Sequence, residues 1–491
     1  MISLLAILLL FLSSVVIGVY GVRAARSTPD FLVASQQISP GWNAMAIAGE
    51  YVSAASVLGL AGLMLKNGVG SLWWAVGFTA GYVAVAALVA GPMRRSGAYT
   101  VPDFADYRLG SRAIRKLCAL IVLVIMWLYL IPQFKGAGVV LHLVSGTPYW
   151  VGVVLAGVVV SSSIAVGGMR AATYVQAFHY VVKLVFISVP ALVLLVRAGE
   201  PGRELALRVD AGAWSRPLLD IHNSGQPLLA TWSVLLATTL GAVGLPHVIM
   251  RFHTSATARI ARRVAVGVIV LLGLFYLFPA VYGLLGRVFA AELITEGHTD
   301  QVTVVLPGAM VPGQWGAVLT ALVAAGAFAA VLSTSSGLLL ALAGGLSHDL
   351  SRSSVPRLRL AVAAGALVAV GLSLPAERVD INVLVGWAFA VAASTFCPLL
   401  VLGIWWRGLT VPGAAAGLVA GVCAATGAAL ASVLTGPHPG WLTVLLAQPA
   451  AWTVPLAFAV MAGVSLLTKP PEWAERAVLR LHIPQRAPGD G

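Results

Sequence analysis

The stretch 42–65 is apolar at both ends and polar in its middle, which carries Gly49, Glu50, Tyr51 and Ser56. It is long enough to cross a bilayer, for which about 20 apolar residues suffice. Inside hydrocarbon, polar groups and irregular backbone are tolerated only where they line a cavity or meet a ligand. The stretch therefore predicts a broken membrane helix with a binding site at membrane depth.

A second interrupted apolar stretch, 231–250, carries Gly241, Gly244, Pro246 and His247. It lies five apolar spans after the first. Paired interruptions at matching positions of two halves indicate an inverted-repeat transporter whose substrate binds at the repeat interface. For His247 two interpretations stay open, a cap on carbonyls freed by the break and a contact to substrate.

A hydroxyl cluster, residues 333–336, lies within a third apolar stretch. Such hydroxyls commonly bond to their own helix carbonyls or to a neighbouring helix. A hard monovalent cation also needs several oxygen ligands, and hydroxyls facing unwound carbonyls would supply them.

Charges within apolar spans cost about 2.5 to 3.5 kcal/mol each at a helix centre, so each needs a reason. Lys135, close to Pro132 and Gly136, could hold a substrate carboxylate, or it could neutralise Glu50 or a helix C-terminus, and both interpretations stay open. Lys183 is interpreted as a structural or cytoplasm-linked charge.

The composition is that of a polytopic membrane protein. Of 491 residues, 59% are hydrophobic and 10% are charged, and the mean hydropathy is +0.94. The formal charge of +13 arises from bases in short connections, which set topology, so no nucleic-acid partner is inferred. No nucleophile–base pair or metal cluster indicates an enzyme.

About thirteen apolar spans are expected, starting with 1–20 and followed by twelve more. An N-terminus outside and a C-terminus in the cytoplasm place most bases inside, as the positive-inside rule requires. The expected organisation is 1–41 N-terminal peripheral helix and cytoplasmic loop, 42–197 first five-helix repeat, 198–226 external loop, 227–404 second five-helix repeat, 405–467 two C-terminal peripheral helices, and 468–491 cytoplasmic tail.

Several motifs together resemble the sodium:solute symporter family, and most closely its bacterial cation/acetate and short monocarboxylate permeases. The resemblance extends from about residue 30 to residue 420. The matching segments are 46–59, 97–104, 167–170, 244–252 and 347–350.

The resemblance implies an all-α, leucine-transporter-like five-plus-five inverted repeat with broken first and sixth core helices. It also implies a sodium site that uses the carbonyls of Gly49 and Val52 and, on the eighth core helix, Ala330, Ser333 and Thr334. A second sodium site found in some members needs an aspartate where this chain has Gln176, so one sodium ion per cycle is expected. Glu50 stands where the permeases carry Asp.

The expected function is sodium-coupled uptake of a small monocarboxylate such as acetate, propionate, pyruvate or lactate, in the inner (plasma) membrane. The alternatives are symport of proline, pantothenate or a sugar, and a proton-coupled carboxylate permease. Sodium is the expected coupling ion and no other cofactor is expected; whether a small membrane-protein partner is needed stays open. Further substrate contacts are assigned to Tyr51, Ser56, Gln133, Gly241 and Gly244.

Overall fold

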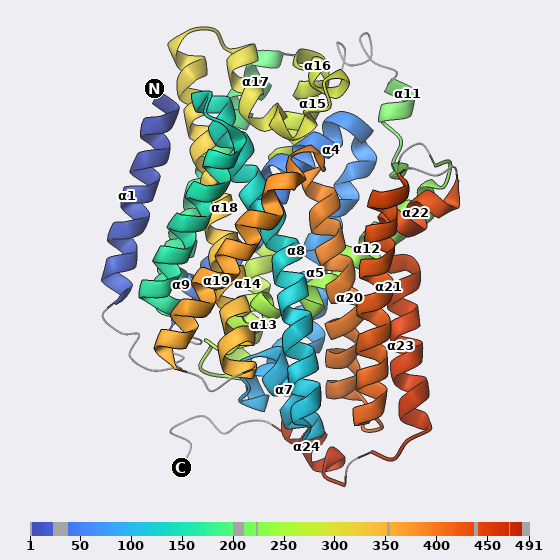
Figure 1. Cartoon of the computed structure of the whole chain (residues 1–491). Helices are drawn as coiled ribbons and strands as arrows, with labels where there is room; N and C mark the ends of the chain where they lie inside the picture. Colours follow the sequence, from blue (N-terminus) through green and yellow to red (C-terminus); the bar gives the residue numbers. More distant parts are fainter. Residues whose placement is uncertain are drawn as a thin grey trace.

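The computed structural model is a helical bundle in which α1 lies at one side and α21 to α23 lie at the other (Figure 1). It describes residues 2–22, 38–199, 211–221, 224–350, 354–436, 440–470 and 472–483, which form helices and turns but no strand. Residues 23–37 of the predicted first loop, 200–210 of the external loop and 484–491 of the tail lie outside the described residues.

The chain forms two successive sets of five spans with peripheral helices on either side. The N-terminal part contains α1 Ile2–Val22, α3 Pro40–Tyr51, η2 Ala55–Gly59, α4 Leu60–Asn67, η3 Val69–Ser71, α5 Leu72–Leu88, α6 Ala90–Ser96, α7 Val101–Leu109, α8 Arg112–Ser145, α9 Tyr149–Ala198 and the short α11 Ala211–Trp214.

The second set contains α12 Pro227–Gly244, α13 Pro246–Phe252, α14 Ala258–Tyr276, α15 Pro279–Phe289, α16 Glu292–Thr295, η5 Thr299–Gln301, α17 Val302–Met310, α18 Gln314–Ala343, η6 Gly344–Asp349, α19 Val355–Ser373, η7 Leu374–Arg378 and α20 Ile381–Trp405. After it come α21 Val411–Thr435, α22 Trp441–Ala447, α23 Ala450–Leu466 and α24 Ala474–His482.

Among the described residues, nine helices are long and apolar enough to cross a membrane, and two bent pairs raise the number to eleven. The 50-residue α9 is divided at Gly168, whose φ of 56° and ψ of −156° are not helical. Because each of its two parts can cross the bilayer, and α1 is a further apolar helix, the fold agrees with the thirteen spans predicted.

Both predicted helix breaks are present. α3 and the segment made of η2 and α4 are bent by 63° relative to each other. α12 ends at Gly244, Leu245 is extended (φ −72°, ψ 116°), and α13 starts at Pro246, which has no N–H to continue the hydrogen-bond ladder. α3 packs against α9, α14 and α18, while α12 packs against α20 and α5, so each broken helix lies against helices of both sets.

Two of the sequence motifs meet at the end of the bundle where α7 lies. Thr100 Oγ1 donates to Asp349 Oδ1 at 3.1 Å, and His348 Nε2 lies 2.9 Å from Asp103 Oδ2. Arg115 Nη2 contacts Asp103 Oδ1 at 2.6 Å and Asp349 Oδ1 at 3.1 Å. Burial opposes ionisation of Asp103, but His348 and Arg115 outweigh it and lower its pKa. These contacts tie α7 and α8 to the end of the α18 span.

The segment predicted as a cytoplasmic tail contains one further helix, α24. Its apolar residues Ala474, Ala477, Val478 and Leu481 are buried, and it packs against α6 and α7. A search for long apolar spans misses this helix because it is short and its other face is charged.

We predict that Gly168→Ala lowers the thermal unfolding midpoint of the protein in detergent. The backbone at Gly168 lies in a region that residues with a side chain enter at a cost of about 1 to 3 kcal/mol. The matched control is Gly371→Ala in α19, where a Cβ meets nothing within 4 Å and alanine favours the helix. Equal effects of the two substitutions would contradict the assignment of Gly168 as the division of α9.

Candidate functional site

The break after α3 leaves backbone groups that its own helix does not satisfy. Val52 is extended (φ −70°, ψ 92°), and the Ser53 N–H lies 3.3 Å from Ser56 Oγ instead of bonding to the Gly49 carbonyl as in a continuous helix. Across the break, the Ala54 N–H donates to Gln133 Oε1 of α8 at 3.0 Å. Within a bilayer such groups need protein partners, so neighbouring helices must supply the remaining donors.

Helix α18 supplies two hydroxyl donors to the broken helix. Ser333 Oγ donates to the Gly49 carbonyl at 2.7 Å, and Thr334 Oγ1 donates to the Glu50 carbonyl at 2.6 Å. Ser333 Oγ also lies 3.2 Å from the Ala330 carbonyl. These residues of the predicted sodium site are thus brought together, and their binding of sodium stays a prediction.

The side chain of Lys183, from the second half of α9, lies among the same oxygens. Its ammonium donates to the Gly49 carbonyl, to the Val52 carbonyl at 2.7 Å and to Ser333 Oγ at 2.9 Å. The side chain is fully buried. At Gly49 a Cβ would collide with the Gln176 carbonyl, so glycine lets α9 approach closely enough for Lys183 to reach the break.

A sodium ion and the Lys183 ammonium cannot share these oxygens at low cost. Two unit positive charges 4 Å apart repel by about 4 kcal/mol at an effective dielectric constant of 20. In the arrangement observed here, the Lys183 amino group occupies the predicted sodium site.

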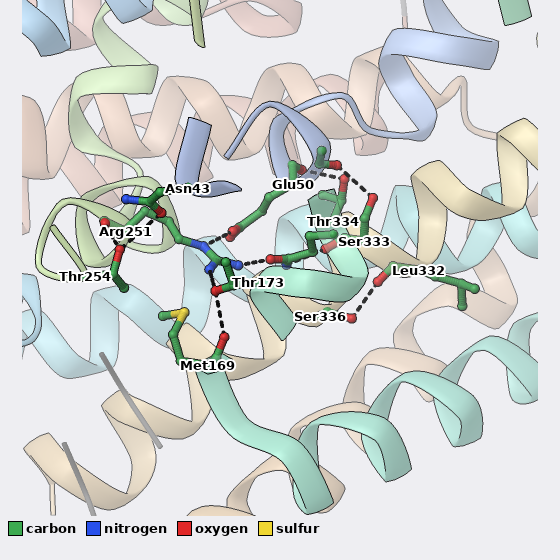
Figure 2. Close-up of polar contacts among 12 residues, drawn as sticks. Asn43, Glu50, Met169, Thr173, Arg251, Thr254, Leu332, Ser333, Thr334 and Ser336 are labelled. Atoms are coloured by element: carbon green, nitrogen blue, oxygen red, sulfur yellow. Dashed lines mark hydrogen bonds and ion pairs between the residues drawn. The ribbon is translucent and has the colours of Figure 1, made fainter. Parts of the chain in front are cut away.

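A second buried cation, Arg251 of α13, neutralises Glu50. Arg251 Nε lies 2.5 Å from Glu50 Oε2, and its other nitrogens donate to Thr173 Oγ1 at 2.8 Å and to Gln176 Oε1. Gln176 Nε2 in turn donates to the Ser333 carbonyl at 2.9 Å. Figure 2 shows the Arg251 side chain between Glu50 and Thr173. The network joins α3, α9, α13 and α18.

The interpretation that Lys135 neutralises Glu50 is wrong. Lys135 Nζ lies 3.1 Å from Asp300 Oδ2 and donates to the Val379 carbonyl at 2.5 Å. Asp300 also accepts from the Ile381 N–H at 3.1 Å, so this ion pair joins α8 to η5 and to the start of α20. For Lys135 to hold a substrate carboxylate, it would have to leave Asp300.

Three residues predicted to contact substrate lie around the α3 break. Ser56 Oγ is 2.9 Å from the Tyr276 hydroxyl, and Gln133 Nε2 donates weakly to the Tyr129 carbonyl at 3.4 Å. The Tyr51 hydroxyl donates to a backbone carbonyl of α5 at 3.3 Å, and its ring lies edge-on to the Tyr82 ring at 4.7 Å. The break is therefore lined by hydroxyls, an amide and aromatic rings.

The α12 residues have different surroundings. At Gly241 and Gly244 a Cβ would collide with backbone atoms of Phe389 and Ala392, so both glycines allow close packing of α12 on α20. His247 is buried, and its two ring nitrogens have no hydrogen-bond partner among the described residues. Its ring lies 5.5 Å from that of Tyr129. The predicted cap on freed carbonyls is therefore not formed in this arrangement.

A cavity of about 440 Å³ lies at the ends of α4 and α20, beside the Lys66–Asp380 ion pair. Asn382 and Gln448 line it. Both are buried, and the Asn382 amide has no hydrogen-bond partner among the described residues. Gly59 packs directly on Asn382, which places this polar cavity next to the second half of the broken helix.

Sequence reasoning did not find the role of Lys183 or the partners of Glu50 and Lys135. The charges of Glu50 and Lys135 within apolar stretches are recognisable from the sequence. Their partners lie on other elements, because Arg251 is far from Glu50 in sequence and Asp300 is far from Lys135. One signal was available for Arg251, which belongs to the motif 244–252.

We predict that Arg251→Met lowers the thermal unfolding midpoint strongly, because removal of one partner of a buried ion pair costs about 3 to 5 kcal/mol. Adding Glu50→Gln should restore part of the loss, since no unpaired carboxylate then remains. The control is Arg407→Met, whose pair with Glu475 is 61% and 63% exposed and which should have a small effect. A double variant no more stable than Arg251→Met would contradict the pairing.

Comparisons with known proteins agree with this architecture. A solved Na⁺-coupled sialic acid symporter, in a substrate-bound outward-open state, superposes with a TM-score of 0.74 at 12% identity, covering 96% of this chain and 98% of its own. A nucleobase-cation-symport-1 family transporter superposes with a TM-score of 0.54 at 16% identity, covering 92% and 98%. These likenesses show the leucine-transporter-like fold.

Sequence comparison shows the family. The uncharacterized symporter YwcA of Bacillus subtilis (strain 168) is 31% identical over 438 residues, which are 85% of this chain and 84% of that protein. The model of the sodium:solute symporter family matches residues 31–421. The chain is therefore a multi-pass membrane transporter rather than an enzyme, and it belongs to the sodium:solute symporter family.

Proposed function

We propose that this protein imports a small monocarboxylate, such as acetate, propionate, pyruvate or lactate, by cation-coupled symport with alternating access. The observation that carries the proposal is the break between α3 and η2, where Ser56, Gln133 and Tyr276 meet a half-helix that starts inside the bundle. The motif resemblance to acetate and short monocarboxylate permeases favours this substrate class over proline, pantothenate or a sugar.

The carboxylate binds at the N-terminal end of the half-helix 55–67 in this proposal. A helix N-terminus carries a partial positive charge and unpaired N–H groups, and broken helices in transporters point such ends at anionic substrate groups. Ser56 supplies a further donor, as does His247, whose ring nitrogens have no hydrogen-bond partner in the described part of the chain. The aromatic rings beside the break exclude large solutes. Lys135 does not contact substrate while Asp300 holds it.

The polar cavity beside Asn382 provides the outer approach to this site. Its walls carry Lys66, Asn67, Asp380 and Gln448, and Asn382 connects it to the broken helix at Gly59. In this proposal the protein lies in the inner (plasma) membrane. The end of the bundle with the cavity faces outside and the end with α7 and α24 faces the cytoplasm, because the cytoplasmic end then carries the bases of α6, α7 and α24. The N-terminus is then outside and the C-terminus inside.

Family membership supports sodium as the coupling ion, and the motif resemblance assigns its site to Gly49, Val52, Ala330, Ser333 and Thr334. A monocarboxylate that moves with one monovalent cation carries no net charge. The membrane potential, worth about 2.3 kcal/mol per charge per 100 mV, then does not drive uptake, whereas a tenfold cation gradient supplies about 1.4 kcal/mol. A second candidate, proton-coupled uptake of the same substrate class, is favoured by the contacts of Lys183.

The test is uptake of labelled acetate, pyruvate and proline into proteoliposomes with imposed sodium or pH gradients, each with the membrane potential clamped at zero or at a negative value. We expect acetate or pyruvate to accumulate to the same extent at both potentials. Accumulation of proline but neither carboxylate, or carboxylate uptake that rises with the potential, would contradict electroneutral carboxylate symport.

A further inference from the structure

We infer that the Lys183 ammonium is the resident cation of the predicted sodium site, and that no sodium ion binds there. The inference goes beyond the proposed symport, because it concerns which cation occupies this site. It assigns to Lys183 a role that sequence analysis gave to bound sodium.

The contacts of Lys183 match those that a bound cation would make. A lysine ammonium has three N–H donors and no acceptor, and here the three donors meet two freed carbonyls, those of Gly49 and Val52, and one hydroxyl, that of Ser333. Each acceptor is a neutral oxygen. Lys135 provides the contrast, because that buried lysine contacts the carboxylate of Asp300 as in an ordinary ion pair.

The position of Lys183 is imposed by packing on three sides. Gly49 brings the α3 backbone against α9, and α18 packs along α9 and also contacts α3. The ammonium therefore holds together three helices, two from the first set of spans and one from the second. Its contacts therefore join the two sets at the place where the predicted sodium ion would join them.

The charged and titratable groups near Lys183 lie on α3, α9, α13 and α15. Glu50 of α3 is paired with Arg251 of α13. His179, one turn before Lys183 on α9, has Nε2 2.7 Å from Ser14 Oγ of α1, and Tyr282 of α15 donates to the Ile187 carbonyl of α9. α1 and α18 contain no Asp, Glu, Lys, Arg or His.

The first experiment measures cation binding without any solute. The thermal unfolding midpoint of the purified protein in detergent is compared in matched sodium and potassium chloride. We expect no difference for the unmodified protein. Lys183→Ala, which frees the oxygens, should gain a sodium-specific rise of at least about 2 °C. Lys135→Ala is the matched control, because its partner is Asp300, and it should gain none.

Lys183→Met provides a neutral side chain of similar length if the alanine variant does not fold. The unmodified protein also tests the inference without any variant, because a sodium-specific rise in its thermal unfolding midpoint would overturn it. A midpoint of Lys183→Ala that is indifferent to sodium would also overturn the claim that the ammonium occupies a sodium site.

The second experiment measures the sodium dependence of transport in proteoliposomes. Counterflow exchange of labelled carboxylate by the unmodified protein should proceed at the same rate in sodium chloride and in potassium chloride. Uptake that requires sodium would overturn the inference. If no carboxylate enters under any gradient, the proposed function fails, and the sodium-binding comparison still decides the role of Lys183.

Discussion

The architecture depends on how the backbone of a broken membrane helix is satisfied where water is scarce. Each carbonyl freed by the break, among them those of Gly49, Glu50 and Val52, would cost several kcal/mol if left without a donor in hydrocarbon. Hydroxyls of α18 and the ammonium of Lys183 provide those donors, while Gln133 accepts from the N–H across the break. The same contacts hold α3, α8, α9 and α18 against one another, so the break organises the bundle as well as the site.

Charge balance follows from this arrangement. Glu50 is neutralised by Arg251 and Lys135 by Asp300, whereas Lys183 contacts oxygens without a formal charge. Buried ion pairs contribute little net stability, but loss of one partner is expensive. The two ion pairs therefore restrict the geometry on either side of the break, and Lys183 contacts the break without a carboxylate partner.

The sequence predicts the span pattern, both helix breaks and the hydroxyl pair because these follow from hydropathy, glycine, proline and family motifs. Arg251 as the partner of Glu50 and Asp300 as the partner of Lys135 could not be predicted, since 201 and 165 residues separate the pairs. The contacts of Lys183 could not be predicted for the same reason. Its sequence neighbours show an apolar helix, and only the approach of α3 at Gly49 shows that its side chain reaches the break.

The most direct measurement is a pair of high-resolution structures of the protein in lipid nanodiscs, one in sodium chloride and one in potassium chloride. The account predicts continuous density from Lys183 to the carbonyls of Gly49 and Val52 in both salts. A separate peak among those carbonyls and Ser333 in sodium only, with Lys183 turned away, would contradict it.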